Sequence, residues 1–133
     1  MTQEGKFLDS ADYSYSVKSE VSGFNEQNPK DWIVALKATI GKLKKKNKAA
    51  ISRLNAIGIA GHMHGATLLD KNGEILHPCI LWNDTRSYKQ ASRLDRDVKL
   101  QEITGNIIFP GFTAPKLLLI QEKKPEIFEK IAK

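Results

Sequence analysis

Apolar residues recur at helical spacing in the first third of the chain. Four of them follow one another at i, i+4, i+8 and i+11: Trp32, Leu36, Ile40 and Leu43. This spacing places side chains on one face of an α-helix. Just before them, Asn28 offers a capping side chain and Pro29 fits a first helical turn. The pattern predicts a helix from Pro29 to about Lys46.

Two segments on either side of this helix have the pattern of strands. The segment from Phe7 to Val17 alternates loosely between apolar and polar residues, with Tyr13, Tyr15 and Val17 on one face, and alternation is typical of a half-buried strand. The segment from Ala50 to Ala60 becomes apolar in its second half and runs into Gly61. We expect its second half to be a buried strand that ends at this glycine.

A β-hairpin is predicted in the middle of the chain. The segments 66–69 and 75–77 flank the dipeptide Asn72-Gly73, which favours the positive φ angles of a tight hairpin turn. A further extended apolar run is expected from Pro78 to Trp82.

Helices are expected again in the second half. Beyond Asn83-Asp84, which can cap a helix, apolar residues keep helical spacing to about Lys99. Thr113 can cap a helix that starts near Pro115, and Pro125 begins a last short one. Strands interspersed with helices predict a mixed α/β fold, and the length fits a single domain over residues 1–133.

Composition narrows the cellular setting. No apolar run approaches the roughly 18 residues that cross a bilayer, so no membrane partner is expected. The N-terminus has no apolar segment of the signal-peptide kind. The single cysteine, Cys79, cannot form an internal disulfide. These features together predict a cytoplasmic protein.

The net charge of +6 raises the question of a polyanionic partner. Much of the positive charge forms a basic cluster at the end of the first predicted helix: Lys42, Lys44, Lys45, Lys46, Lys48 and Arg53. Cations there complement the helix dipole and stay solvated, although the cluster could also bind an anion. No aromatic residues interleave with the lysines, so a nucleic-acid-binding domain is the less favoured alternative.

The triplet His62-Met63-His64 is the first candidate site. It lies between Gly61 and Gly65, directly after a predicted buried strand, and residues at strand ends in α/β sheets line ligand-binding crevices. The imidazoles could bind a metal, make ordinary hydrogen bonds or contact a small molecule. No third ligand stands at metal-binding spacing, and flanking glycines let a ligand approach the backbone closely. No metal site is assigned.

The second candidate site is Trp82-Asn83-Asp84-Thr85-Arg86. An aromatic face, an amide, a carboxylate and a guanidinium suit a polyhydroxylated ligand, but a core Trp82, a capping Asp84 and a solvated Arg86 would explain the same residues. Lys116 likewise could contact a ligand or extend its ammonium to solvent from the start of a helix. No complete catalytic set and no phosphate loop of the G-x-x-x-x-G-K-[ST] kind is visible.

Three stretches in this order resemble the FGGY carbohydrate kinases, in particular the xylulokinase branch of that family. They are Gly58 to Asp70, Leu81 to Arg86, and the run from Ile103 to Asn106 continued by Pro110 to Leu118. The resemblance implies a partial ribonuclease-H-like (actin-like ATPase) domain, with a mixed sheet, flanking helices and the first strands missing. Two positions depart from the family pattern, since His62 replaces a usual Gln and Leu119 a usual Trp.

The resemblance also implies a function and a pocket. Family members transfer the γ-phosphate of ATP, with Mg²⁺, to a sugar hydroxyl, here the 5-hydroxyl of D-xylulose. The sugar-contacting positions fall on Met63, His64, Trp82, Asn83 and Asp84, and the segment 113–118 shapes the site.

The family's phosphate loop, catalytic aspartate and ATP-binding lobe have no counterpart in this sequence, so no catalytic residue is assigned. We expect a fragment of the sugar-binding lobe that binds no ATP or Mg²⁺, is inactive alone and self-associates through an exposed strand edge. A non-catalytic sugar-binding or regulatory module is the alternative.

Overall fold

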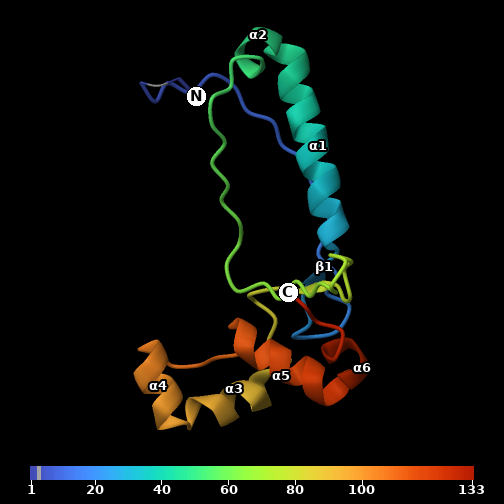
Figure 1. Ribbon diagram of the computed structural model, residues 1–133, viewed down its shortest axis with the longest axis vertical. Coiled ribbons are helices and arrows are strands. Elements are labelled where there is room, and N and C mark those ends of the chain that lie inside the picture. The colour runs from blue at the N-terminus through green and yellow to red at the C-terminus, as the bar shows by residue number, and fades with distance from the viewer. Residues whose placement is uncertain (3) are drawn as a thin grey trace. The chain divides into compact units, whose positions relative to one another are not determined.

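The computed structural model describes residues 1–2 and 4–133. Two compact units can be distinguished in it (Figure 1). The first combines Met1–Ser16 with Lys30–Ala60, and the second combines Val17–Pro29 with Gly61–Lys133. Among the described residues, no helix is both long and apolar enough to cross a bilayer.

The first unit is built around α1 (Pro29–Lys46), which is followed by the short α2 (Lys48–Ile51). The predicted bounds of α1 are confirmed. Asp31 lies in its first turn and three lysines lie in its last, so charges of the favourable sign face both ends of the helix dipole. Local signals alone therefore determine where this helix begins and ends.

Both strands predicted beside α1 are wrong. Residues 7–17 have no regular secondary structure, and residues 50 and 51 belong to α2. The chain that follows α2, green in Figure 1, is extended without forming a strand. Ile57 and Ile59 on it are 74% and 93% exposed. A strand needs a neighbouring backbone to take up its N–H and C=O groups, and alternation of apolar residues cannot provide that neighbour.

The sheet of the second unit is small. Strands β1 (Glu26–Gln27) and β2 (Cys79–Ile80) pair antiparallel, with Glu26 opposite Ile80. Single bridges extend the pairing at Lys18–Glu26, Ala66–Ile80 and Leu69–Ile75. The predicted hairpin is confirmed by the Leu69–Ile75 bridge and by the hydrogen bond from the N–H of Leu76 to the carbonyl of Leu68 at 2.9 Å.

The hairpin turn differs in detail from the prediction. Among the described residues of the turn, only Gly73 has a positive φ, at 81°. Its N–H donates to the carbonyl of Asp70 at 3.0 Å, and the Asp70 carboxylate accepts from the N–H groups of Asn72 and Glu74 at 2.8 Å each. The carboxylate thus stabilises a longer turn in which Asn72 keeps an ordinary backbone conformation.

Four helices complete the second unit: α3 (Tyr88–Asp95), α4 (Val98–Thr104), α5 (Thr113–Lys123) and α6 (Pro125–Phe128). The single helix predicted to reach Lys99 is wrong, because Asp97 interrupts it by accepting a hydrogen bond from the backbone N–H of Lys99 at 3.0 Å. This side chain caps α4 and so separates it from α3. Asp84 does not cap α3, whose N-cap is Ser87.

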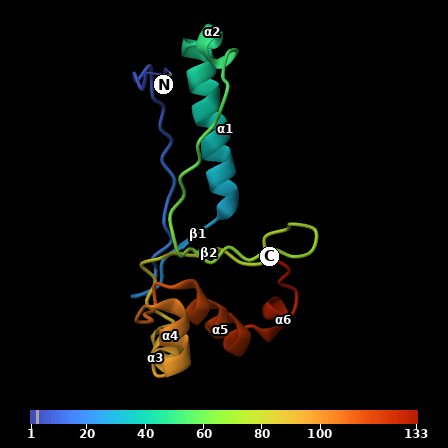
Figure 2. The same ribbon diagram turned by 60° about the vertical axis from the view of Figure 1, so that its left-hand side comes forward.

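The core lies between the hairpin and the C-terminal helices. Ala66, Leu68, Ile80 and Ile120 are buried together, and apolar residues of α5, α6 and the hairpin pack around them. Figure 2 shows α5 leading into α6 with the C-terminus beyond it. Leu69 pairs with the end of the chain, donating to the carbonyl of Lys133 and accepting from the N–H of Ala132 at 2.9 Å each. The end of the chain is thus tied to the hairpin of the second unit.

Candidate functional site

Residues 61–64 and Trp82, which lies two residues after β2, line one cavity in the second unit. A cavity of about 470 Å³ is lined by Gly61, His62, Met63, His64, Trp82 and Phe109. The structure therefore brings together three of the five predicted contact residues, Met63, His64 and Trp82. These positions are close because Ala66 pairs with Ile80, which brings the segment before Ala66 beside the segment after Ile80.

The cavity presents large apolar side chains to solvent. Met63 is 71% exposed, Trp82 58% and Phe109 47%. A hollow that gathers apolar surface beside a few polar groups is typical of small-molecule sites. The alternative in which Trp82 is a core residue is therefore wrong.

His64 has an unusual backbone. Its φ is 61°, the only positive value outside glycine among the described residues, and this region disfavours side chains other than Asn, Asp and His. Its ring lies 4.7 Å from that of Phe112, which in turn lies 4.2 Å from the ring of Phe109. A row of three rings thus fixes the imidazole at the edge of the cavity.

Asp84 is placed differently from its neighbours. It is fully buried, and its carboxylate accepts from the Arg86 guanidinium at 2.6 Å and from the backbone N–H of Asn25 at 2.7 Å. Arg86 also reaches Glu26 at 2.7 Å and lies over the ring of Phe24 at 3.8 Å. The predicted solvated Arg86 is wrong, and the Asp84 carboxylate is engaged by the protein itself.

Asn83 is exposed next to Trp82. Its carbonyl accepts from the side-chain amide of Asn25 at 3.2 Å, so the backbone of this loop is tied down while the Asn83 side chain faces outward. Direct sugar contact by Asn83 and Asp84 stays a prediction.

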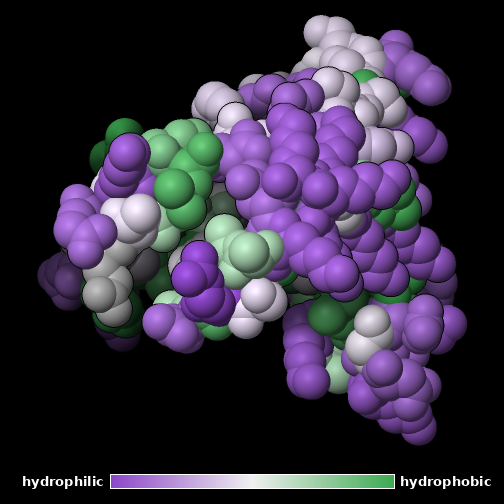
Figure 3. Space-filling model, turned by 90° about the horizontal axis from the view of Figure 1, so that it is seen from above, coloured by the Kyte–Doolittle hydropathy of each residue, from purple (hydrophilic) through white to green (hydrophobic). Residues whose placement is uncertain are grey.

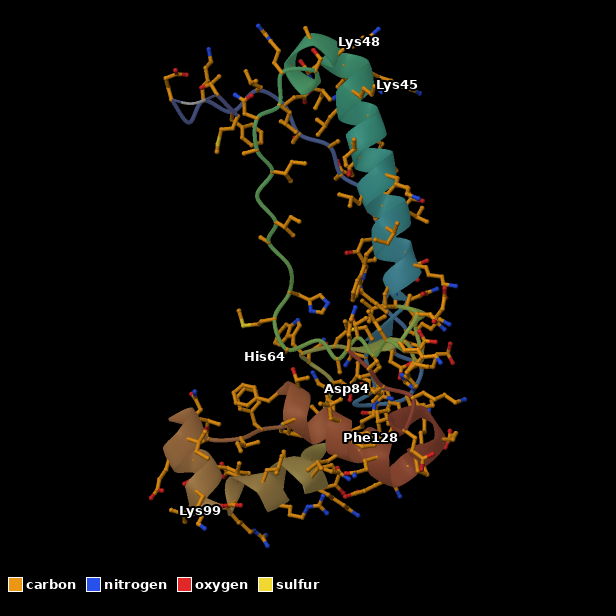
Figure 4. All side chains as sticks on the ribbon, viewed as in Figure 1. Lys45, Lys48, His64, Asp84, Lys99 and Phe128 are labelled. Atoms are coloured by element: carbon orange, nitrogen blue, oxygen red, sulfur yellow. The ribbon has the colours of Figure 1, made fainter. Side chains whose placement is uncertain are left out.

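The alternative in which Lys116 extends its ammonium to solvent is wrong. Lys116 is fully buried, and its ammonium donates to the carbonyl oxygens of His64 at 2.6 Å and Gly111 at 2.7 Å. Burial lowers the pKa of Lys116, while the nearby Cys79 and Asp84 raise it. Neither solvent nor a ligand is needed to explain the position of the ammonium. Figure 4 shows His64 and Asp84 close to the first half of α5, the helix that carries Lys116.

His62 packs against the backbone of Gly65. A Cβ added to Gly65 would come 2.2 Å from Cε1 of His62 and 3.0 Å from Sγ of Cys79, so a larger residue here would displace the His62 ring. Cys79 is fully buried, and burial raises the pKa of its thiol.

The third histidine lies apart from this site. His77 is hydrogen-bonded through both ring nitrogens, to the carbonyl of Pro78 and to the ammonium of Lys124, each at 2.7 Å. Across the described part of the chain, no three His, Cys, Asp or Glu side chains form a group that could hold a metal ion.

Sequence reasoning did not identify Phe109 and Phe112 as site residues. The available signal was the Pro110-Gly111 turn between the two phenylalanines, because a tight turn brings the side chains on either side of it together. The burial of Lys116 had no comparable signal.

The basic cluster of the first unit is mostly exposed. Lys42 donates to the carbonyl of Asp12 at 2.7 Å, and Lys46 lies 3.7 Å from the Asp9 carboxylate. Figure 3, which views the molecule from the end where α2 lies, shows mainly hydrophilic residues on that face. The figure is compatible with a solvated cluster. That nucleic acid is not a partner stays a prediction.

Comparison with known proteins assigns the chain to a family. The model of the FGGY family of carbohydrate kinases, N-terminal domain, matches residues 1–133. The chain belongs to this family. It is 36% identical over 135 residues to the xylulose kinase of Lactococcus lactis, with 100% of this chain and 27% of the relative covered. It is 44% identical over 111 residues to that of Escherichia coli, with 83% and 22% covered.

Solved structures agree. A xyloylose kinase from Brucella ovis matches with a TM-score of 0.87 and 47% identity, covering 89% of this chain and 24% of that one. The xylulose kinase from Rhodospirillum rubrum matches with a TM-score of 0.80 and 27% identity, covering 88% and 25%. The predicted actin-like α/β fold class is confirmed by these neighbours.

Membership also confirms the predicted enzyme family, the FGGY carbohydrate kinases. The chain spans 22–27% of the length of these curated relatives.

Proposed function

We propose that this chain forms the sugar-contacting part of the N-terminal lobe of a kinase that phosphorylates the 5-hydroxyl of D-xylulose. One observation supports this most directly. This chain belongs to the FGGY family, and its cavity is lined by Met63 and His64 together with Trp82 and Phe109.

The residues of the cavity suit a sugar chemically. The C–H faces of a sugar are apolar and pack against aromatic and thioether side chains, whereas its hydroxyl groups need hydrogen-bonding partners. Met63, Trp82 and Phe109 supply the first kind of surface. The exposed His64 imidazole supplies the second, and the exposed Asn83 next to Trp82 is a further candidate outside the cavity lining.

Two carboxylates of the second unit, Asp84 and Asp70, are used structurally. Asp84 is buried in its ion pair with Arg86, and Asp70 holds the hairpin turn. Neither is free to accept a proton from a sugar hydroxyl, so we assign no catalytic base to this chain.

ATP and Mg²⁺ would supply the phosphoryl group in the family reaction. Among the described residues, no three His, Cys, Asp or Glu side chains form a group that could hold a metal ion, and no residue of this chain is assigned to ATP. Their binding is therefore assigned to no residue here, and we propose that the 133-residue polypeptide alone does not catalyse phosphoryl transfer.

The sugar site is tested by NMR titration of the ¹⁵N-labelled chain with D-xylulose, with the aldose D-xylose as a control. We expect shifts at Met63, His64 and the Trp82 indole. His64→Ala should abolish them, while His62→Ala should have less effect. Because Ala is strained at the positive φ of this position, His64→Gly serves as a second variant that removes the ring without strain. Equal loss from the His62 and His64 variants, or no shifts in the parent chain, would contradict the proposal.

A further inference from the structure

We infer that Lys116 is a positioning residue of the cavity, whose buried ammonium holds the His64 peptide and the Gly111 turn together. The two acceptors are carbonyl oxygens, one of them 52 residues earlier in the chain and the other 5 residues earlier. Lys116 thus joins the Met63–His64 wall to the wall that carries Phe109 and Phe112. Its effect on sugar binding rests on the proposed function, but its effect on geometry does not.

The first wall needs such a support. Residues 61–65 form no helix or strand, so no regular ladder of hydrogen bonds holds them. His64 nevertheless adopts a positive φ, a conformation that persists only where the surroundings enforce it. The carbonyl of this same residue accepts the 2.6 Å hydrogen bond from Lys116.

The second wall is packed tightly around Gly111. A Cβ at Gly111 would come 2.5 Å from the carbonyl oxygen of Trp82 and 3.0 Å from the ring of Phe109. By binding the Gly111 carbonyl at 2.7 Å, Lys116 anchors the point where these two cavity residues meet. One ammonium is therefore linked to His64 directly and to Trp82 and Phe109 through Gly111.

A lysine at this position is costly without a role. Taking an ammonium out of water is unfavourable unless hydrogen bonds and opposite charge compensate. Here two carbonyls and the nearby Asp84 carboxylate compensate it. An apolar residue of equal volume would fill the space on α5 but would donate to neither carbonyl, so only the ring contacts of His64 would join the two walls.

The test uses Lys116→Met, which keeps the volume and removes the donors, with Lys123→Met as the matched control on the exposed side of the same helix. Without sugar, we expect Lys116→Met to lose the strong intraresidue HN–Hα NOE of His64 that a positive φ gives, and the NOE between the His64 and Phe112 rings. NOEs between Ile80 and Ile120 should remain and report an intact core. Retention of both His64 signals in Lys116→Met would overturn the inference.

A measurement on the unaltered chain keeps the inference testable if Lys116→Met does not fold, and a titration extends the test if it does. In the unaltered chain, scalar couplings across the hydrogen bonds should connect Nζ of Lys116 to the carbonyl carbons of His64 and Gly111, and their absence would overturn the inference. In a D-xylulose titration, Lys116→Met should weaken binding about tenfold or more, as expected for loss of one charge-assisted hydrogen bond or more, and Lys123→Met should leave it unchanged. If the parent chain binds no sugar, the proposed function fails while the sugar-free signals still decide the role of Lys116.

Discussion

The guanidinium of Arg86 lies 2.6 Å from the carboxylate of Asp84, with the two side chains 11% and 0% exposed. This buried pair stands directly after Trp82 and Asn83, and the backbone N–H of Asn25 completes it. This ion pair therefore fixes the loop that holds Trp82 at the cavity. The ion pair joins the strand segment around Glu26 to the loop that carries the indole.

Breaking this pair should destabilise the second unit strongly. Arg86→Met leaves the Asp84 carboxylate buried without its partner, which should lower the free energy of unfolding by about 3–5 kcal/mol. Arg93→Met is the matched control, because the Arg93–Glu122 pair has its arginine side chain 61% exposed and should lose about 1 kcal/mol or less. Urea unfolding of both variants measures the difference, and equal losses would contradict the assigned role.

Gly111→Ala should distort the cavity. The added Cβ would meet the backbone carbonyl of Trp82, which cannot move without shifting the loop, so we expect a loss of about 1–3 kcal/mol. The ¹⁵N resonance of the Trp82 indole should shift as well. Gly58→Ala is the control, since nothing lies within 4 Å of its added Cβ. An unmoved indole resonance in Gly111→Ala would be the contrary result.

Glu122 should make stability depend on pH. Hydrogen bonds from Gln90 and then Arg93 lower the pKa of Glu122 below its usual 4.5. A carboxyl with a lowered folded-state pKa stabilises the protein above the unfolded-state value and loses this contribution as pH falls through the folded-state value. The difference in unfolding free energy between the parent and Glu122→Gln should therefore shrink between about pH 5 and about pH 2. A difference that stays constant over this range would refute the link between α3 and α5.

The 133-residue polypeptide should show no kinase activity. Phosphoryl transfer depends on groups that position the phosphates and Mg²⁺, and none is assigned to this chain. A coupled assay of ADP release with D-xylulose and Mg-ATP measures this. Sugar-dependent turnover above background would show that the chain carries catalytic groups that we have not recognised.

The extended segment after α2 should promote self-association. Ile57 and Ile59 expose their side chains on an extended stretch that forms no strand in the described chain. An extended backbone with unpaired N–H and C=O groups can pair with a strand of another molecule. The charge of +6 opposes association, but salt screens it beyond roughly 8 Å at physiological ionic strength. Light scattering at micromolar concentration should show dimers or aggregates that increase with salt.

Two substitutions distinguish association through this extended segment from nonspecific hydrophobic association. Ile59→Lys should reduce the association, because it places a charge on the extended segment after α2. Ile103→Lys, at a residue of α4 that is 79% exposed, should have less effect. A monomer at physiological salt, or equal effects of the two variants, would count against this segment as the cause.

The sequence by itself determined the features that depend on neighbouring residues. The bounds of α1 follow from Asn28, Pro29 and the apolar spacing, and the hairpin follows from the Asn72-Gly73 turn. In both cases the interacting atoms lie within a few residues of one another, so the local sequence is enough to predict the element. The family was likewise recognisable from its motifs, and the resemblance to it implied that Met63 and His64 share a pocket with Trp82, as the cavity has them.

The tertiary structure alone decided the features that need a distant partner. The segments 7–17 and 52–60 have strand-like patterns but no neighbouring backbone to pair with among the described residues. Asp84 and Lys116 are charged residues that a sequence pattern places at the surface. Their burial depends on Asn25, His64 and Gly111 arriving from other parts of the chain with groups that compensate the charge. Desolvation and its compensation are set by three-dimensional neighbours, and no spacing along the chain encodes them.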